Sequence, residues 1–337
     1  MESKNVILSE EMCKEVKTPE EMLALCKELQ TIIVEYMLKK YKSEILQGKE
    51  PSKCPTIYII GGQNASGKSK LISVLKQKNQ NSVSIIIDDM KAHHPFRRYI
   101  DRNFPNQSEG ILHLACFEVF DKLLKDLLNE GYDITIERTL GSKEKMQKFV
   151  VEPSNHNYNI QVNVTATHEI NSLLSSLERF IYECRLKDEF SSKNTGLKID
   201  PRPITLEHHD NTYRNICDVL NETENGCFIN NKGENIYPQI HVWDRTPENP
   251  SEIYVTGDGR FSCAKEAMYY GRENDLKRCK SNRDYGYKTR IDNIKEELKN
   301  ARKEDTLYEY IEYCNEFLTE VEKRGAIYIG DTTRNKY

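Results

Sequence analysis

The residues best suited to chemistry form a glycine-rich turn behind the apolar run TIYII (56–60), and the turn matches the pattern G-x-x-x-x-G-K-[ST] at every fixed position. Glycines let successive backbone N–H groups approach one phosphate, and the helix expected from Lys68 to Gln77 adds its positive end. Lys68 supplies a mobile charge for the β- and γ-phosphates, and Ser69 supplies a hydroxyl for Mg²⁺. The pattern predicts binding of ATP and Mg²⁺ by Gly62, Gln63, Asn64, Ala65, Ser66, Gly67, Lys68 and Ser69.

Two acids follow the next apolar run, SVSIII (82–87), which predicts a strand closed by Asp88 and Asp89. An acid at the carboxyl end of the strand that directly follows the loop faces the crevice where such sheets bind ligands. There, Asp88 can accept the proton of an acceptor hydroxyl during phosphoryl transfer. A Walker B pair that holds Mg²⁺ for ATP hydrolysis, or a simple helix cap, are the alternatives, and the spacing favours the base.

Further polar residues come near the same sheet edge. Glu137 closes the predicted strand 132–137, Thr139 follows it, and Asp121 lies on the helix predicted over 110–131. A sugar or nucleoside acceptor needs several such groups to fix its hydroxyls. On spacing alone, a solvated helix face explains Asp121 better than a substrate contact does.

Two arginines are candidates for the charge of the transferring phosphate. Arg179 lies in the helical segment SSLERF, and Arg202 lies in the loop DPRPITLEHHD. A guanidinium on each side of the γ-phosphate stabilises it, although either residue alone is typical of a protein surface.

The order of the elements predicts an α/β fold, with a P-loop kinase-type parallel sheet flanked by helices. Further strands are expected at 159–167, 238–244 and 251–257, and a leading helical pattern covers 19–46. After about Gly259 the chain is helical, polar and rich in charge. We therefore expect a kinase domain over 1–258, including the leading helices, and an added C-terminal helical region over 259–337.

Composition excludes several classes of protein. The 337 residues carry 49 basic and 53 acidic side chains, so there is no overall positive charge of the kind that binds nucleic acid or anionic membranes. No apolar run approaches the length that spans a bilayer, and the first residues do not resemble an export signal. The ten cysteines have no metal-ligand spacing. These features predict a cytoplasmic protein with free thiols and without a membrane partner.

Beyond the phosphate-binding loop, several segments resemble the zeta toxins of bacterial toxin–antitoxin systems. These segments occur in the family's order over about residues 40 to 245. They are EILQGKEPSKCPTIYIIGGQNASGKSKL, IDDMKAHHP, EGYDITIERT, HEINSLLSSLERFIYE and PRPITLEHHD. Zeta toxins are P-loop kinases that use ATP and Mg²⁺ to phosphorylate a hydroxyl of UDP-N-acetylglucosamine, which blocks the synthesis of cell-wall precursors.

The resemblance implies a role for each matched residue. Asp88 takes the position of the catalytic base, Lys68 that of the P-loop lysine, and Arg179 and Arg202 those of the phosphate-clamping arginines. The implied substrate-binding residues are Asp88, Lys91, His94, Asp121, Glu137 and Thr139. The family also implies a separate small helical antitoxin that blocks the ATP site.

The chain departs from the family at Arg138, where zeta toxins usually have glycine, and at Asp121, which replaces a glutamate. A different hydroxyl acceptor therefore stays open: a nucleotide, an antibiotic or a polynucleotide 5′ end. A regulatory ATPase switch and a binding module with a degenerate site are further alternatives. The basic run 272–290 fits nucleic acid, but a solvated helix face explains it better.

Overall fold

The computed structural model describes residues 8–104, 107–192, 201, 203–246, 248–281 and 286–329. The chain forms two compact units, each assembled from separate stretches of sequence. The first unit comprises Met1–Lys53, Asn81–Ile134 and Leu186–Asp200, and the second comprises Cys54–Gln80, Thr135–Arg185 and Pro201–Tyr337. The boundary predicted between residues 258 and 259 stays a prediction.

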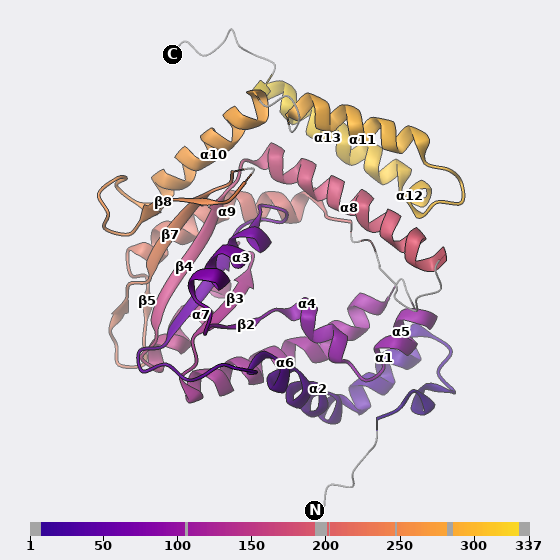
Figure 1. Cartoon of the computed structure of the whole chain (residues 1–337), viewed down its shortest axis with the longest axis horizontal. Coiled ribbons are helices and arrows are strands. Elements are labelled where there is room, and N and C mark those ends of the chain that lie inside the picture. Colours follow the sequence, from indigo (N-terminus) through magenta and orange to yellow (C-terminus); the bar gives the residue numbers. More distant parts are fainter. Residues whose placement is uncertain are drawn as a thin grey trace, which may run out of the picture. The chain divides into compact units, whose positions relative to one another are not determined.

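Helices dominate the first unit (Figure 1). Its elements are η1 (Glu10–Cys13), α1 (Pro19–Glu28), α2 (Gln30–Ile45), β2 (Val83–Ile85), α4 (Ile87–Met90), η2 (Lys91–His93), α5 (Arg97–Asn103) and α6 (Ser108–Glu130). A capping box starts α1, because the Thr18 hydroxyl accepts from the N–H of Glu21, whose carboxylate accepts from the N–H of Thr18. The single helical pattern predicted over 19–46 is divided in two at Leu29.

The strand predicted over 82–87 is shorter than expected. Only Val83–Ile85 forms the strand, and the acids that were expected to close it lie instead in the first turn of α4. Ile86 is still extended (φ −119°, ψ 120°), but its N–H donates to the hydroxyl of Tyr41 on α2 at 3.2 Å and is not available to a strand partner, and α4 begins at Ile87. The predicted helix over 110–131 is confirmed as α6, which ends at Gly131 in the left-handed region (φ +77°).

The second unit contains most of the sheet and the remaining helices. Its strands are β1 (Thr56–Gly61), β3 (Ile134–Arg138, of which Ile134 falls in the first unit), β4 (Asn159–Ala166), β7 (Gln239–Asp244) and β8 (Ser251–Val255), with the hairpin strands β5 (Phe228–Ile229) and β6 (Asn235–Ile236). Its helices are α3 (Lys68–Lys78), α7 (Lys143–Asn155), α8 (Glu169–Ser192, up to Arg185 in this unit), α9 (Leu206–Glu224), α10 (Ala264–Ser281), α11 (Tyr287–Asn300), α12 (Thr306–Glu309) and α13 (Ile311–Ile329).

These strands lie in the order β3-β1-β4-β7-β8. β1 pairs parallel to β4, and β4 pairs parallel to β7, with Gly61 opposite Val164. β8 is antiparallel to β7, because the connection 245–250 is too short for the crossover that a parallel pair needs. The predicted class, a mostly parallel sheet flanked by helices, is confirmed.

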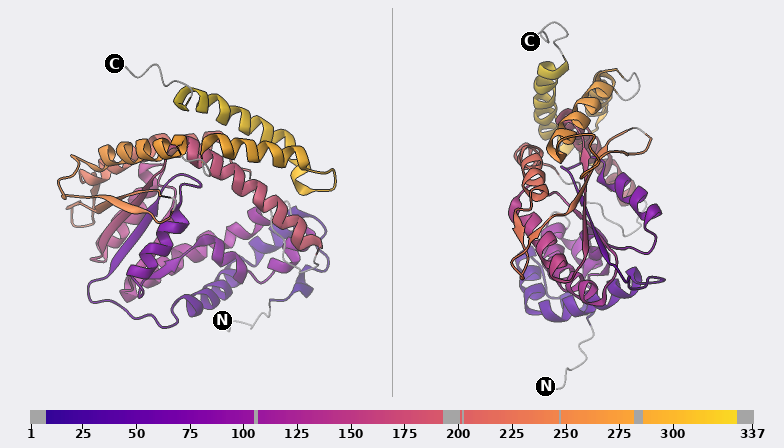
Figure 2. Two further views of the ribbon diagram at one scale, coloured as in Figure 1. Left: turned by 45° about the horizontal axis from the view of Figure 1, so that its top comes forward. Right: turned by 90° about the vertical axis from the view of Figure 1, so that its left-hand side faces the viewer.

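The C-terminal helices share a hydrophobic core with α8. Seven apolar residues of α8, between Ile170 and Cys184, pack against buried residues of α10, α11, α12 and α13. Figure 2 shows α11 and α13 running along α8. The C-terminal helices therefore help to fix the position of α8, the helix that carries Arg179.

Two findings concern the cysteines and the apolar content of the helices. All ten cysteines are free thiols. Among the described helices, none has both the length and the apolar content needed to cross a bilayer.

Replacing Phe180 with alanine tests how much the shared core contributes. Its ring is 1% exposed and meets the rings of Tyr310 and Tyr313 edge to face, each at 5.2 Å between centroids. We expect Phe180→Ala to lower the free energy of unfolding by about 3–5 kcal/mol, measured by denaturant titration. Tyr182→Ala, on the same helix but 56% exposed, should change it by less than about 0.5 kcal/mol. Equal effects of the two substitutions would contradict the shared core.

Candidate active site around the phosphate-binding loop

The loop between β1 and α3 has three residues in the left-handed backbone region. Their φ angles are +149° at Gly62, +53° at Ala65 and +95° at Gly67. A Cβ atom at Gly62 would lie 2.4 Å from the Ser66 hydroxyl oxygen and 2.5 Å from the Thr165 hydroxyl oxygen. Only glycine fits this position, so the glycine that the motif requires has a direct structural reason.

Lys68 is the first residue of α3 and is 8% exposed. Its ammonium group donates to the carbonyls of Gly62 at 3.1 Å and Gln63 at 3.0 Å, and it lies 3.7 Å from a carboxylate oxygen of Glu137. Burial lowers the pKa of Lys68, Glu137 opposes that shift, and the positive charge of Arg179 adds to it. Three predicted site residues thus interact in the structure, since Glu137 and Arg179 both act electrostatically on Lys68.

Threonines at the end of β4 hold the loop from behind. The Thr165 hydroxyl donates to the Ser66 hydroxyl, and the Thr167 hydroxyl donates to the Ser66 carbonyl, both at 2.7 Å. The side-chain amide of Gln63 donates to the Thr167 carbonyl at 2.7 Å. Sequence reasoning missed these threonines, although the predicted strand 159–167 contains both, because the motif names only the residues of the loop itself.

Arg245 is a second residue that the sequence did not single out. One guanidinium nitrogen donates to the Ala65 carbonyl and another to the Ser175 hydroxyl, each at 3.1 Å. Burial lowers the pKa of Arg245. Arg245 directly follows β7, and the carboxyl ends of parallel strands are where such sheets bind ligands, which is the signal that could have found it.

The side chain of Arg138, the departure from the zeta toxin pattern, lies over the ring of Phe149 on α7 at 4.9 Å from the ring centroid. It also donates to the carbonyl of Glu137 at 3.2 Å. Thr139 follows β3 and is partly buried. The added cation therefore has partners on its own strand and on α7.

Two further predicted residues of the second unit are partly exposed. Arg179 is about half exposed, and its Nε lies 3.6 Å from Glu183. Ser69 is exposed in the first turn of α3, one residue after Lys68. The hydroxyl of Ser69 is an oxygen ligand of the kind that Mg²⁺ prefers, and the glycine-lined loop beside Lys68 fits a phosphate group.

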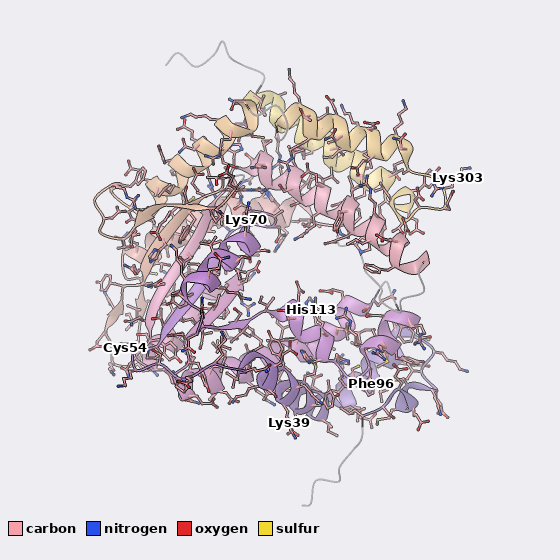
Figure 3. The ribbon with its side chains drawn as sticks, viewed as in Figure 1. Lys39, Cys54, Lys70, Phe96, His113 and Lys303 are labelled. Carbon is pink, nitrogen blue, oxygen red and sulfur yellow. The ribbon has the colours of Figure 1, made fainter. Side chains whose placement is uncertain are left out.

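In the first unit, Asp88 forms a charged cluster with residues of η2 and α6. The Lys91 ammonium group lies 2.5 Å from Asp88 and also contacts Glu109. The imidazole of His113, on the same helix as Glu109 (Figure 3), lies 3.1 Å from that carboxylate. Lys91 is buried, whereas the Asp88 side chain is 62% exposed, so a buried cation holds an accessible carboxylate. Glu109 was not predicted.

Asp121 lies on α6 and is exposed. It comes three turns after Glu109, about 18 Å along the helix axis at 1.5 Å per residue. The cluster around Asp88 therefore does not include Asp121, and its place in a substrate site stays a prediction.

His94 is 3% exposed, and its Nδ1 accepts the N–H of Phe96 at 3.2 Å. Its Nε2 is buried and has no hydrogen-bond partner among the described residues. Burial, with a smaller contribution from Arg97, lowers the pKa of His94 to about 3, so the ring is neutral at physiological pH.

The predicted site residues are divided between the two units. The phosphate-binding loop, Glu137, Thr139 and Arg179 belong to the second unit, and Asp88, Lys91, His94 and Asp121 belong to the first. Arg202 lies outside the described residues.

A family model described as zeta toxin matches residues 42–245, which is more than half of the chain and contains the loop, Asp88, Glu137 and Arg179. The chain belongs to the zeta toxin family. Zeta toxins are P-loop kinase-like toxins, so the loop geometry and the family membership agree. Helices α10 to α13 lie beyond the stretch that the family model matches.

Individual relatives agree with this assignment. The chain is 24% identical to Toxin zeta of Streptococcus pyogenes over 220 residues, which are 62% of this chain and 72% of that protein. It is also 24% identical to Toxin PezT of Streptococcus pneumoniae over 230 residues, 68% of this chain and 83% of that protein.

A solved structure from the PezAT chromosomal toxin–antitoxin system of Streptococcus pneumoniae has the same fold. Its TM-score is 0.55 at 17% identity, and the match covers 86% of this chain and 96% of that one.

The neutral state of His94 predicts a pH-dependent stability. Its folded pKa of about 3 lies below the ordinary value of about 6.5, so the unfolded chain binds the extra proton as the pH falls between these values. His94 therefore contributes stability above pH 6.5 that is lost toward pH 3. Between pH 8 and pH 5, the free energy of unfolding of the wild type should fall by about 2 kcal/mol more than that of His94→Asn. This substitution keeps an acceptor for the Phe96 N–H.

Denaturant titrations of both proteins at each pH measure this difference. His156→Asn, which removes the imidazole at the partly exposed C-cap of α7, is the control substitution. Parallel pH curves for wild type and His94→Asn would show that His94 is not held neutral.

Proposed function

We propose that the protein is an ATP- and Mg²⁺-dependent kinase that transfers the γ-phosphate to a hydroxyl of a UDP-amino sugar such as UDP-N-acetylglucosamine. In this reaction the acceptor oxygen bonds to the γ-phosphorus, the bond between the β- and γ-phosphates breaks, and ADP leaves. Asp88 accepts the proton of the hydroxyl. The cytoplasmic consequence is a block in the synthesis of cell-wall precursors.

The observation that carries the proposal is the 3.7 Å separation between Lys68 and Glu137. Lys68 is the P-loop lysine, and Glu137 matches a sugar-contacting position of the zeta toxins. An acceptor-binding carboxylate beside the lysine that holds the γ-phosphate suits transfer to a bound hydroxyl. A switch that hydrolyses ATP needs no acceptor residue there.

The other residues then divide by role. Lys68, Arg179 and Arg202 balance the charge of the transferring phosphate, and Ser69 binds Mg²⁺. Thr139, Asp121, Lys91 and His94 contribute to the acceptor site in this proposal. Lys91 also orients the Asp88 carboxylate, since its buried ammonium contacts that group.

A protein partner belongs to the proposal as well. The PezAT structure comes from a toxin–antitoxin system. By analogy, we propose a separate small helical antitoxin that blocks the nucleotide site of this protein. A kinase for a nucleotide, an antibiotic or a polynucleotide 5′ end is the second candidate, favoured by Arg138, which adds a cation next to the predicted acceptor residues.

Mass spectrometry of reaction products tests the acceptor. The protein is incubated with ATP, Mg²⁺ and a panel of UDP-sugars and nucleosides, and we expect one phosphate added to UDP-N-acetylglucosamine. Lys68→Ala provides the background, because it removes the charge that the γ-phosphate requires. Phosphate release at the same rate without any acceptor would favour the ATPase switch, and a phosphorylated nucleoside would favour the second candidate.

Replacing the proposed base separates catalysis from binding. Asp88→Asn should keep ATP affinity, measured by calorimetry, while the rate of transfer falls roughly 10²-fold or more, because the amide cannot accept the hydroxyl proton. Asp89→Asn is the matched control, since both carboxylates are exposed in the same first turn of α4. Transfer at the wild-type rate by Asp88→Asn would remove the base assignment.

A further inference from the structure

A chain of buried and partly buried side chains runs from the phosphate-binding loop to α13. It starts at Gln63, which is fully buried and donates through its amide nitrogen to the Thr167 carbonyl at 2.7 Å and to the Ser172 hydroxyl at 3.3 Å. The amide oxygen of Gln63 has no hydrogen-bond partner among the described residues. These two donated bonds therefore orient the side chain.

The next link joins α8 to α9. The Ser172 hydroxyl oxygen lies 2.8 Å from Nε2 of His209, and Nδ1 of that ring lies 3.3 Å from a carboxylate oxygen of Asp210. Burial lowers the pKa of His209, so the ring is neutral and carries one proton. Because an ionised carboxylate only accepts hydrogen bonds, that proton is on Nδ1, and Nε2 accepts the Ser172 hydroxyl proton.

The final link is a charge pair with α13. The Arg324 guanidinium donates to both oxygens of Asp210, at 2.7 and 2.8 Å, and to Glu169 at 3.0 Å. Burial pushes the pKa of Asp210 up, but the hydrogen bonds from Arg324 and His209 bring it below its ordinary value. Arg324 thus keeps Asp210 charged, and that charge fixes the proton of His209.

We propose that Arg324 is a positioning residue for the nucleotide: through Asp210, His209 and Ser172 it holds Gln63, and with it the phosphate-binding loop, in the conformation that binds ATP. All the hydrogen bonds of this relay point one way, from Gln63 toward Asp210. The inference rests on the proposed function, and it gives the C-terminal region a role in the nucleotide site.

A second, separate contact from the C-terminal region reaches the same loop. Arg278 on α10 binds both oxygens of Asp244, one of them at 2.9 Å, and donates to the carbonyl of Arg245 at 2.6 Å. Arg245 in turn donates to the Ala65 carbonyl. Two helices beyond the family-matched stretch therefore support the loop through different residues, which favours a functional rather than incidental connection.

The loss of Arg324 should propagate along the relay. Without the guanidinium, Asp210, which is 8% exposed, keeps only the exposed Arg214 at 3.7 Å as a counter-charge, and it binds a proton or turns away. His209 then no longer requires its proton on Nδ1, the Ser172 hydroxyl can rotate, and Gln63 loses a directed partner. The result is a less ordered loop and weaker ATP binding.

Calorimetric titration of ATP–Mg²⁺ into the full-length protein, without acceptor, tests the relay. Arg324→Met should weaken ATP binding at least tenfold at temperatures well below its unfolding midpoint, and Arg324→Lys should restore part of the affinity by keeping the charge beside Asp210. Lys323→Met, at the neighbouring and exposed position of α13, should bind ATP as the wild type does.

Ser172→Ala interrupts the relay but leaves the ion pair between Arg324 and Asp210 in place. It therefore still tests the relay if Arg324→Met does not fold. It should also weaken ATP binding. In a double-mutant cycle, Gln63→Met combined with Ser172→Ala should be no weaker than Gln63→Met alone, because both act through one path.

The outcomes separate this inference from the proposed function. If folded Ser172→Ala or Arg324→Met binds ATP with wild-type affinity, or if the effects in the cycle add, the relay is overturned and the kinase proposal stands. If the wild type itself binds no ATP, the proposed function fails, and the relay as a device for positioning the nucleotide fails with it.

Discussion

The burial of one ammonium group, that of Lys68, organises the second unit. An amine that is taken out of water must find acceptors, and here two carbonyls of its own loop and the carboxylate of Glu137 supply them. The backbone at Gly62, whose carbonyl is one of these acceptors, has a φ angle of +149°. The arrangement keeps a charge at a place where it costs stability, which is common where a protein binds a charged ligand.

The first unit shows a related arrangement around Lys91. This lysine is 3% exposed and contacts two carboxylates, those of Asp88 and Glu109. Removing either carboxylate would leave the other to balance the buried charge alone. Asp88 therefore also balances the charge of a buried lysine. The zeta toxin pattern identifies Asp88 only by its position in the sequence and does not include this contact.

The sequence predicted much of the fold because the responsible signals are local. A strand, a glycine-rich turn and a helix start occur within residues 56–69, and the apolar stripe of α6 ends at a glycine that can adopt a left-handed backbone. The strand before Asp88 was predicted too long, because the hydroxyl of Tyr41, more than forty residues earlier, binds the backbone at Ile86. An isolated apolar run does not contain that information.

The sequence also predicted some residues of the candidate site but not others. Motif positions found Lys68 and Glu137, which the structure brings together. Thr165, Arg245 and Glu109 were missed, since their importance comes from partners 99 or 180 residues away in the chain or on another helix. Hydrogen bonds over such separations depend on how the strands are ordered in the sheet, and a spacing pattern in one sequence does not specify that order.

The core that α8 shares with the C-terminal helices has a consequence for biosynthesis. The ribosome completes α8 long before it makes α11 and α13, whose apolar residues cover that helix. At roughly 5–20 residues per second, the apolar face of α8 waits on the order of ten seconds for its partners. The phosphate-binding loop is thus translated early, but the contact that Arg278 of α10 makes beside it, with the carbonyl of Arg245, forms only late in synthesis.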